Sequence, residues 1–222
     1  MKPQKTHIHV NEFANRYDDY IADKQWIGPE LIFKSLEPFL KQEQKLLDLG
    51  IGTGMASIRF ANAGIIVSGM DCSEEMLKIC EAKKTTDKLY LGDLASEDCP
   101  WPDENFDFII SNAFFHFIPH PGKIFENTGN HLKTSGYFCF TTLKSGIGND
   151  LEYFETETPG ITSWKNPENG LFIYKHSEEF IENLLKTNNL EFISKTSFLG
   201  FKDETEGKQV YFELFLAKKK NS

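Results

Sequence analysis

An acidic residue followed by three closely spaced glycines is the part of this sequence best suited to chemistry. Residues 45–54 read KLLDLGIGTG, in which Asp48 precedes Gly50, Gly52 and Gly54. The apolar run predicts a buried parallel strand, and the glycines predict a tight turn directly after it. Because glycine has no Cβ, the turn can adopt positive φ and a ligand can lie against its backbone. The sequence therefore predicts a nucleotide-type ligand at this turn.

The spacing of the glycines indicates which ligand this is. A dinucleotide fingerprint reads G-x-G-x-x-G and places a pyrophosphate at the start of a helix. This chain has G-x-G-x-G, and its first Lys or Arg after the turn is Arg59. Asp48 without a nearby cation fits a ligand end that carries an ammonium better than one that carries phosphates. Here the chain resembles the class I S-adenosylmethionine-dependent methyltransferases, whose first motif is an acid followed by spaced glycines. The resemblance implies S-adenosylmethionine as cofactor and S-adenosylhomocysteine as its product.

A second acid follows in the order that the family shows. Residues 65–70 predict a second strand, which ends at Asp71, about 20 residues after the glycines, where a ribose-binding acid belongs. In the next residues, DCSEEML, Ser73 is a predicted helix N-cap. In the family this pattern carries the ribose acid and places an apolar side chain, here Met76, against the adenine. Cys72, beside Asp71, is expected to line the same part of the site.

Two further segments resemble the family. Residues 88–91 predict a third strand, and Asp93 and Leu94 follow it, as in the family segment where an acid and a backbone amide bind adenine. Residues 99–119, CPWPDENFDFIISNAFFHFIP, resemble the stretch P-x-P-D-x-x-F-D followed by a buried strand. Asn112 lies at the carboxyl end of that strand, so we expect it to contact the methionine portion of the cofactor.

The sequence indicates the residues that would contact the methyl acceptor less clearly than those that would bind the cofactor. His116 lies just beyond the fourth predicted strand and is the candidate general base, with a packed structural histidine as the alternative. Near the N-terminus, Tyr17 with Asp18 resembles an aromatic-acid pair of small-molecule methyltransferases. Four aromatic residues of this segment predict a cover over the cofactor: Phe13, Tyr17, Tyr20 and Trp26. The first three keep helical spacing, so for them a face packed on the sheet is the alternative.

Strands and helices alternate from residue 45 onward, which predicts an α/β fold with a doubly wound, mostly parallel sheet. The family resemblance implies a seven-stranded Rossmann-like sheet whose last strand is antiparallel beside the fifth. Further helices are predicted at 55–63, 121–131 and 177–187, strands at 137–143, 190–199 and 209–218, and turns at 133–136 and 203–207. We expect one domain that consists of an N-terminal helical cover (1–44), a cofactor-binding core (45–144), a lid or substrate insertion (145–176), and a C-terminal helix and hairpin (177–222).

Composition narrows the class of protein. The chain has 222 residues with 40% hydrophobic content, enough for one core without disulfides or metal. A net charge of −9 argues against a standing affinity for nucleic acid. The four cysteines show no C-x-x-C spacing, so no metal site is predicted, and they suit a reducing cytoplasm. No apolar stretch approaches the roughly 20 residues of a membrane span. We therefore expect a cytoplasmic enzyme, monomer or homodimer, with a small-molecule acceptor.

Two other functions stay open at this point. A regulatory protein that binds S-adenosylmethionine without catalysis would carry the same motifs. An NAD(P)-dependent oxidoreductase would use a similar sheet, but the glycine spacing and the lack of a recognisable set of hydride-transfer residues disfavour it.

Overall fold

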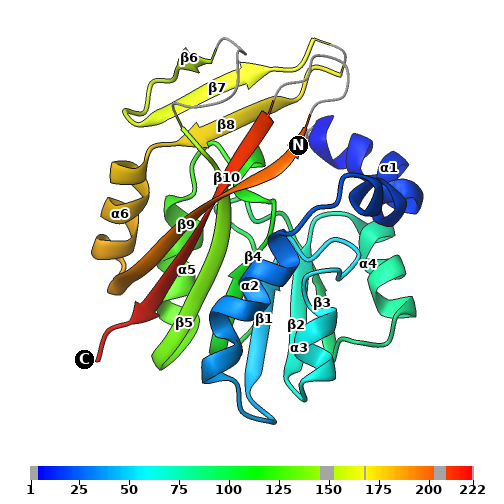
Figure 1. Cartoon of the computed structure of the whole chain (residues 1–222), viewed down its shortest axis with the longest axis vertical. Coiled ribbons are helices and arrows are strands. Elements are labelled where there is room, and N and C mark those ends of the chain that lie inside the picture. Colours follow the sequence, from blue (N-terminus) through cyan, green and yellow to red (C-terminus); the bar gives the residue numbers. More distant parts are fainter. Residues whose placement is uncertain (1–4, 146–152, 168, 203–208, 222) are drawn as a thin grey trace.

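The computed structural model describes residues 5–145, 153–167, 169–202 and 209–221. Its centre is a seven-stranded sheet with helices on both faces (Figure 1), which confirms the predicted α/β class. The strands are β1 (Lys45–Leu49), β2 (Ile66–Asp71), β3 (Lys88–Leu91), β4 (Phe106–Ser111), β5 (Leu132–Leu143), β9 (Leu190–Lys202) and β10 (Gln209–Lys219). Their order across the sheet is β3-β2-β1-β4-β5-β10-β9.

The direction of the strands also matches the expectation. β1 pairs in parallel with β2 on one side and with β4 on the other, so that Leu46 faces both Val67 and Phe108. β10 lies antiparallel between β5 and β9, which confirms the predicted antiparallel last strand. The chain proceeds outward in both directions from β1 and β4, so the topological switch point lies between these two strands. Ligands of open α/β sheets bind beyond the carboxyl ends of the strands at such a point.

Each face of the sheet is covered by its own set of helices. Successive strand residues point to opposite faces, and both faces are buried, which explains the continuous apolar runs in the sequence. Leu46 packs in the cluster that contains Ile32 and Phe60, whereas Leu47 packs in the cluster that contains Phe125 and Ile181. The first face is covered by α2 (Gly28–Leu36), α3 (Ile58–Asn62) and α4 (Glu74–Ala82), and the second by α5 (Gly122–His131) and α6 (Glu178–Thr187).

Two predicted helix caps are present. Ser73 Oγ accepts a hydrogen bond from the N–H of Met76 at 3.1 Å, and Ser177 Oγ accepts one from Phe180 at 3.2 Å. Such a cap contributes about 1 kcal/mol to helix stability. At α4 it also fixes the direction in which the chain leaves Asp71, and this matters for the site.

Some element boundaries differ from the expectation. α3 begins only at Ile58, because the preceding residues continue the glycine turn, in which the N–H of Ser57 donates to Gly54 O at 3.1 Å. The turn predicted at 133–136 is wrong, because β5 already begins at Leu132 and includes these residues as an irregular stretch. Ser135 has φ 64°, and the pairing with β4 shifts register there. The turn predicted at 203–207 lies outside the described residues.

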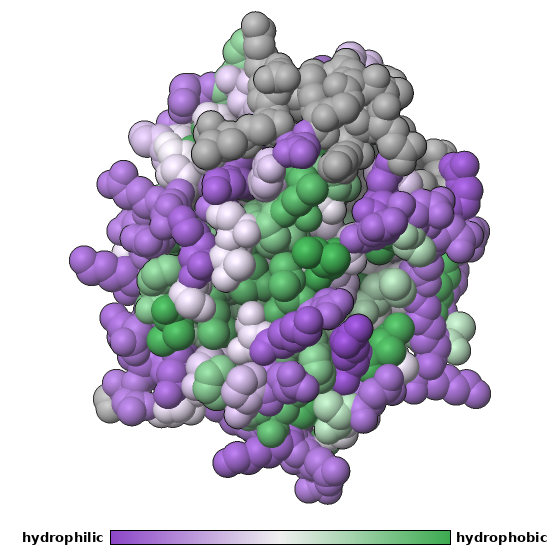
Figure 2. Space-filling view, in the orientation of Figure 1, coloured by the Kyte–Doolittle hydropathy of each residue, from purple (hydrophilic) through white to green (hydrophobic). Residues whose placement is uncertain are grey.

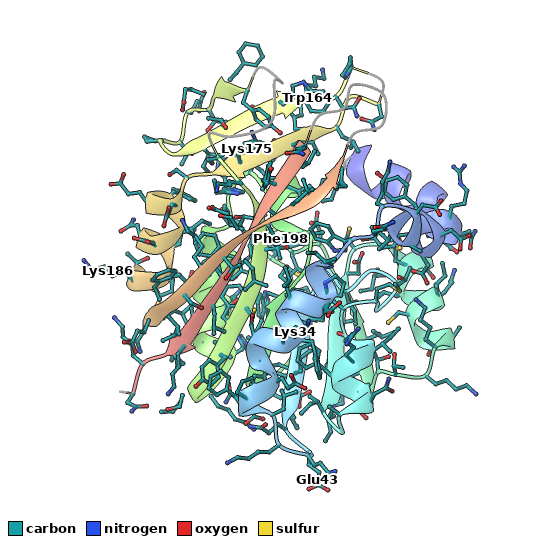
Figure 3. All side chains as sticks on the ribbon, in the orientation of Figure 1. Lys34, Glu43, Trp164, Lys175, Lys186 and Phe198 are labelled. Carbon is teal, nitrogen blue, oxygen red and sulfur yellow. The ribbon has the colours of Figure 1, made fainter. Side chains whose placement is uncertain are left out.

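A smaller structure lies over one end of the sheet. β6 (Phe154–Glu155), β7 (Ile161–Lys165) and β8 (Phe172–His176) form a separate antiparallel sheet in that order. A ring nitrogen of His176, Nε2, lies 3.0 Å from Ile118 O, which follows the short helix η2 (Phe115–Phe117) and so connects this sheet to the core. Figure 3 shows Trp164 of the small sheet at one end of the molecule and Glu43, just before β1, at the other. The small sheet therefore lies at the carboxyl end of the parallel strands.

Candidate cofactor site

The glycine turn connects β1 to α3 at this carboxyl edge. Gly50, Gly52 and Gly54 all have positive φ, at 71°, 55° and 84°. The N–H groups of Gly50 and Ile51 both donate to Met70 O, at 2.9 and 3.0 Å, so the turn is attached to the end of β2. Local sequence explains this conformation, because only glycine adopts such φ values without strain.

The three glycines differ in what surrounds them. A Cβ at Gly50 would lie 2.5 Å from the Phe114 ring, and one at Gly54 would lie 2.7 Å from Cys80 Sγ. Those two positions need glycine for internal packing. At Gly52 a Cβ would meet no atom within 4 Å, so this glycine borders open space. The backbone at Gly52 is therefore the part of the turn that a ligand can approach.

Asp71 lies beside that open space. One carboxylate oxygen accepts the N–H of Gly52 at 2.8 Å, and the other accepts the N–H of Ser73 at 2.9 Å. Asp71 is buried at the end of β2, and the α4 cap holds the adjoining backbone. Hydrogen bonds from N–H groups favour the ionised carboxylate. An ionised, fixed carboxylate is suited to accept the two hydroxyls of a ribose.

Asp48 is buried near the end of β1, directly before the turn. Its Oδ2 accepts a hydrogen bond from Ser57 Oγ at 2.7 Å, whereas its Oδ1 has no partner among the described residues. Burial, opposed by the Ser57 hydrogen bond and assisted by the charge of Asp71, raises the pKa of Asp48 to about 7. A buried acceptor atom without a partner costs free energy, so a cationic or N–H group of a ligand would be stabilised there.

Helix α1 (Lys5–Asp23) covers this region. Burial raises the pKa of Tyr17 to about 12, with further contributions from Asp71, Asp18 and Asp48. The Tyr17 hydroxyl therefore lies within electrostatic reach of both acids of the site. Asp18 accepts a hydrogen bond from Thr53 Oγ1 at 2.5 Å and pairs with Lys83 Nζ at 2.6 Å. The side chain of Phe13 lies outside the described part of the chain.

The predicted adenine-binding residues gather at the ends of β2 and β3. The charges of Asp71 and Asp93 contribute, after burial, to the raised pKa of the Cys72 thiol, so these three side chains are neighbours. Met76 and Leu94 are buried next to them in the chain. Asp93 Oδ1 accepts the N–H of Ala95 at 2.9 Å, which shapes the turn after β3.

Asn112 and His116 lie beyond the end of β4. Asn112 Oδ1 and His116 Nδ1 are buried and have no hydrogen-bond partner in the described residues. Burial lowers the pKa of His116 to about 3, and the nearby His176 contributes to this. The imidazole is therefore neutral at physiological pH and a weak base. Whether it acts catalytically stays a prediction.

The sequence did not indicate every contact of the site. Thr53 carries a hydroxyl within the glycine turn, and this was the only feature of the sequence that could have indicated its hydrogen bond to Asp18. Nothing in the sequence indicated Lys83, because its partner Asp18 lies 65 positions earlier. Trp26 belonged to the predicted aromatic segment, but its ring packs against Phe198 and Phe212 rather than against the turn. Tyr17, in contrast, lies within electrostatic reach of Asp71 and Asp48.

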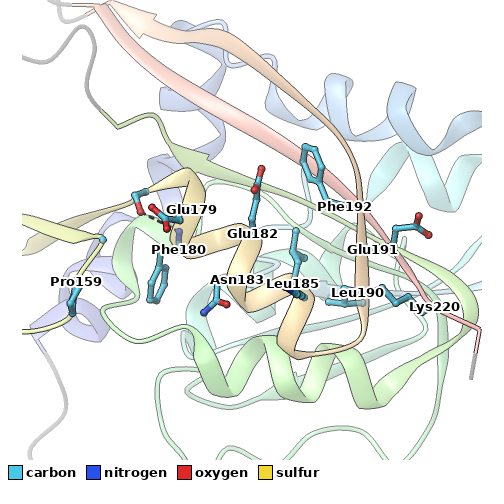
Figure 4. Close-up of a pocket in the computed structure, with 13 residues that line it drawn as sticks. Pro159, Glu179, Phe180, Glu182, Asn183, Leu185, Leu190, Glu191, Phe192 and Lys220 are labelled. Carbon is cyan, nitrogen blue, oxygen red and sulfur yellow. Dashed lines mark hydrogen bonds between the residues drawn. The ribbon is translucent and has the colours of Figure 1, made fainter.

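A separate groove of about 780 Å³ lies between α6 and β9 (Figure 4). Its lining includes Phe180, Glu182, Leu185, Leu190, Phe192 and Lys220, and it contains none of the residues of the glycine turn. In Figure 1, α6 lies on the opposite side of the molecule from α1 and α4. The groove is therefore not the cofactor site.

In the part of the chain that the structure describes, His, Cys, Asp and Glu side chains form no group of three that could hold a metal ion. The helices of this part include none with the length and apolar character that crossing a membrane requires.

Comparison with known proteins agrees with this geometry. Residues 47–140 match the model of a methyltransferase domain. Over 129 residues the chain is 33% identical to an uncharacterised protein of Methanocaldococcus jannaschii, a match that covers 57% of each chain. Over 184 residues it is 26% identical to the malonyl-[acyl-carrier protein] O-methyltransferase of Priestia megaterium, covering 79% of this chain and 65% of that protein. The chain thus spans about half to two thirds of the length of the curated relatives it matches.

A solved structure extends the comparison of folds. The 1,6-didemethyltoxoflavin-N1-methyltransferase of Burkholderia thailandensis, solved with 1,6-didemethyltoxoflavin and S-adenosylhomocysteine, superposes with a TM-score of 0.67 at 15% identity. The superposition covers 96% of this chain and 88% of that one. Residues 47–140 thus match a methyltransferase domain, and the strand order with β10 antiparallel beside β5 and the open glycine turn next to Asp71 agree with that match.

Proposed function

We propose that this chain is an S-adenosylmethionine-dependent methyltransferase that acts on a small-molecule acceptor. The observation that carries the proposal is the open space at Gly52, bordered by the Asp71 carboxylate at 2.8 Å from the Gly52 N–H. The positive φ of Gly52 already favours glycine at this position, and the open space beside it leaves room for a ligand to lie against the backbone.

Different residues of the site would bind different parts of the cofactor. Asp71 would hold the ribose hydroxyls. Cys72, Met76, Asp93 and Leu94 would line the adenine, which needs apolar contacts and an acceptor for its exocyclic amine. Asp48, whose Oδ1 has no partner among the described residues, and Tyr17 would bind the charged methionine end.

S-adenosylmethionine, when bound, supplies a methyl group that its sulfonium has already activated. The protein therefore has to align the acceptor with that methyl group and exclude water. The cover by α1 and the small sheet β6-β7-β8 at the same edge are suited to exclude water. Methyl transfer with His116 as general base would require an acceptor acidic enough to give its proton to a weak base.

The nature of the acceptor rests on indirect support. The net charge of −9 favours a small molecule over a nucleic acid. The names of relatives include acceptors from ubiquinone biosynthesis and phosphoethanolamine, which are small molecules, as well as a carrier-bound malonyl group. A cytoplasmic location and a monomeric or homodimeric state complete the proposal.

Isothermal titration with S-adenosylmethionine, S-adenosylhomocysteine and NAD⁺ tests the proposal. We expect binding of the first two ligands in the micromolar range and no binding of NAD⁺. Saturable binding of NAD⁺ would favour the oxidoreductase alternative, and binding of none of the three would refute the site. A screen for transfer of a labelled methyl group then separates an enzyme from a regulatory protein that only binds the cofactor.

A further inference from the structure

The exposed side of helix α6 borders the groove that takes no part in the cofactor site. Four side chains of α6 line this groove and are exposed: Glu179, Glu182, Asn183 and Lys186. Their spacing of i, i+3, i+4 and i+7 places them on one side of the helix. These four residues, here called the α6 stripe, therefore form a continuous polar surface along about two turns.

The charges of the α6 stripe have no ion-pair partner among the described residues. Lys186 follows Glu182 by four positions, which is the spacing at which Glu30 and Lys34 form an ion pair of 2.6 Å on α2. On α6 no such pair joins the two side chains within the described part of the chain, and Glu179 is likewise without one. The stripe can therefore offer its charges to another molecule.

These charges have a direction along the groove. Glu179 lies in the first turn of α6, whereas Lys186 lies in the last turn. Lys220 lines the groove at the Lys186 end, because its backbone N–H donates to Asn189 O at 3.1 Å, just after the helix. Glu191 lines that end as well, so two lysines there face one acid. The groove is therefore acidic at one end and basic at the other.

Apolar side chains accompany the stripe. Phe192 of β9 is 40% exposed and lines the groove together with the half-buried Phe180, above the buried Leu185 and Leu190. In Figure 4, Phe192 and Glu182 extend to the same side from β9 and α6. Figure 2 shows hydrophilic side chains projecting at the edge of the molecule where α6 lies in Figure 1, with hydrophobic side chains beside them. Apolar contacts within a polar rim are typical of protein–protein interfaces.

We propose that this groove is the interface of a homodimer in which two copies of α6 pack antiparallel about a two-fold axis. A two-fold interface uses the same patch on both copies, so the patch has to be complementary to itself. With the axis between Glu182 and Asn183, each Glu179 lies opposite the Lys186 of the other copy. Glu182 then lies opposite the other copy's Asn183, whose carboxamide N–H groups donate to the carboxylate. Parallel packing would instead place like charges opposite each other.

The same arrangement brings apolar surface together. Phe192 lies beside the C-terminal half of α6, so the two-fold axis places it against the Phe180 of the other copy. Exposed ion pairs add little affinity, so they select the antiparallel orientation, whereas the aromatic contacts supply most of the binding. The groove contains none of the residues of the glycine turn, and α6 lies on the opposite side of the molecule from α1 and α4 (Figure 1). The inference therefore does not depend on the proposed function.

Sedimentation velocity over a range of protein concentrations tests the interface. We expect a monomer–dimer equilibrium in the micromolar range. Glu179→Lys or Lys186→Glu places like charges at both symmetry-related contacts and should raise the dimer dissociation constant about ten- to hundredfold. Glu75→Lys and Lys78→Glu change the net charge equally at an exposed pair on α4, so both should dimerise like the unmodified chain.

A mixture of the two α6 variants supplies the decisive comparison. In a heterodimer of Glu179→Lys with Lys186→Glu, both contacts again join opposite charges. We expect the equimolar mixture to dimerise about as tightly as the unmodified chain, although each variant alone does not. The double variant, which carries both changes in one chain, should recover in the same way. Circular dichroism checks that every variant retains the fold.

Three results would overturn the interface. A chain that stays monomeric at all concentrations would leave the groove to a different partner, and a dimer that tolerates both charge reversals would use another surface. A mixture that stays monomeric would exclude the antiparallel arrangement. Titration of the same samples with S-adenosylhomocysteine keeps the two proposals apart. Dimers that do not bind this ligand would support the interface and refute the cofactor site, whereas binding by a strictly monomeric chain would do the reverse.

Discussion

Asp18 accepts a hydrogen bond from Thr53 Oγ1 at 2.5 Å, which attaches helix α1 to the glycine turn. The second carboxylate oxygen of Asp18 lies 2.6 Å from Lys83 Nζ, at the C-terminal end of α4. One side chain thus joins the cover helix to two parts of the cofactor site. Tyr17 is the adjacent residue, and its phenol lies within electrostatic reach of Asp71 and Asp48.

Loss of this attachment should loosen the cover without unfolding the core. Both side chains of the ion pair are partly exposed, so the pair itself is worth at most about 1 kcal/mol. We expect Lys83→Met to weaken S-adenosylhomocysteine binding about two- to fivefold, and Asp18→Ala to weaken it more, since that change removes both contacts. Hydrogen exchange in α1 should become faster. Lys78→Met, which removes exposed ion pairs on α4, is the control and should change neither quantity.

Removal of the Asp71 carboxylate should affect the cofactor selectively. Charge-assisted hydrogen bonds are worth roughly 1.5–3 kcal/mol, so Asp71→Ala should weaken S-adenosylhomocysteine binding by about one to two decades. Calorimetry measures the affinity, and circular dichroism checks that the fold persists. Asp98→Ala, at an exposed acid, should bind normally. An unchanged affinity in Asp71→Ala would show that the ribose assignment is wrong.

Substitutions at Gly52 and Gly64 distinguish the effect of backbone strain from the effect of a side chain that occupies the ligand's space. Both have positive φ, so alanine at either position should destabilise the fold by about 1–2 kcal/mol. Only at Gly52 does the new Cβ point into the open space of the site, whereas at Gly64 it contacts Gln42. Thermal unfolding should report similar losses for the two variants. Calorimetry should report lost cofactor binding for Gly52→Ala alone, with Gly52→Val more severe, and equal binding by both would refute the ligand position.

The raised pKa of Asp48 predicts a pH dependence of binding. The pKa of this carboxyl is about 7 in the folded chain against an ordinary value of 3.8, so the folded state retains a proton that the unfolded state has already lost. Its contribution to the free energy of unfolding therefore falls as pH rises from about 4 to 7. A cationic ligand group at Asp48 favours the ionised form and releases this proton on binding.

We therefore expect the affinity for S-adenosylhomocysteine to rise as pH increases from about 6 to 8. Asp48→Asn should bind more weakly at pH 8 and should show a much smaller change across this range. Its free energy of unfolding should also fall less than that of the unmodified chain between pH 4 and 7. Equal pH profiles for the two proteins would place the ammonium elsewhere.

The sequence by itself determined those elements that depend only on residues close to one another in the chain. Asp48 with its three glycines specified a strand and a turn of positive φ, because no other residue takes these angles at so little cost. Ser73 and Ser177 specified helix starts through their own hydroxyls. The order of Asp71, Asp93 and Asn112 after successive strands was sufficient to place all three at one edge, because parallel strands end at the same side.

Only the tertiary structure decided which distant side chains meet. Asp18 pairs with Lys83, and Trp26 packs against Phe198. Both contacts depend on how α1 and α2 lie on the sheet, and the periodicity of the sequence does not predict that arrangement. The second sheet β6-β7-β8 and the irregular start of β5 likewise depend on pairing with distant strands. The raised pKa of Asp48 follows from its burial, which cannot be predicted from the neighbouring residues in the sequence. Local propensities are encoded residue by residue, whereas desolvation and long-range contacts arise only when the whole chain packs.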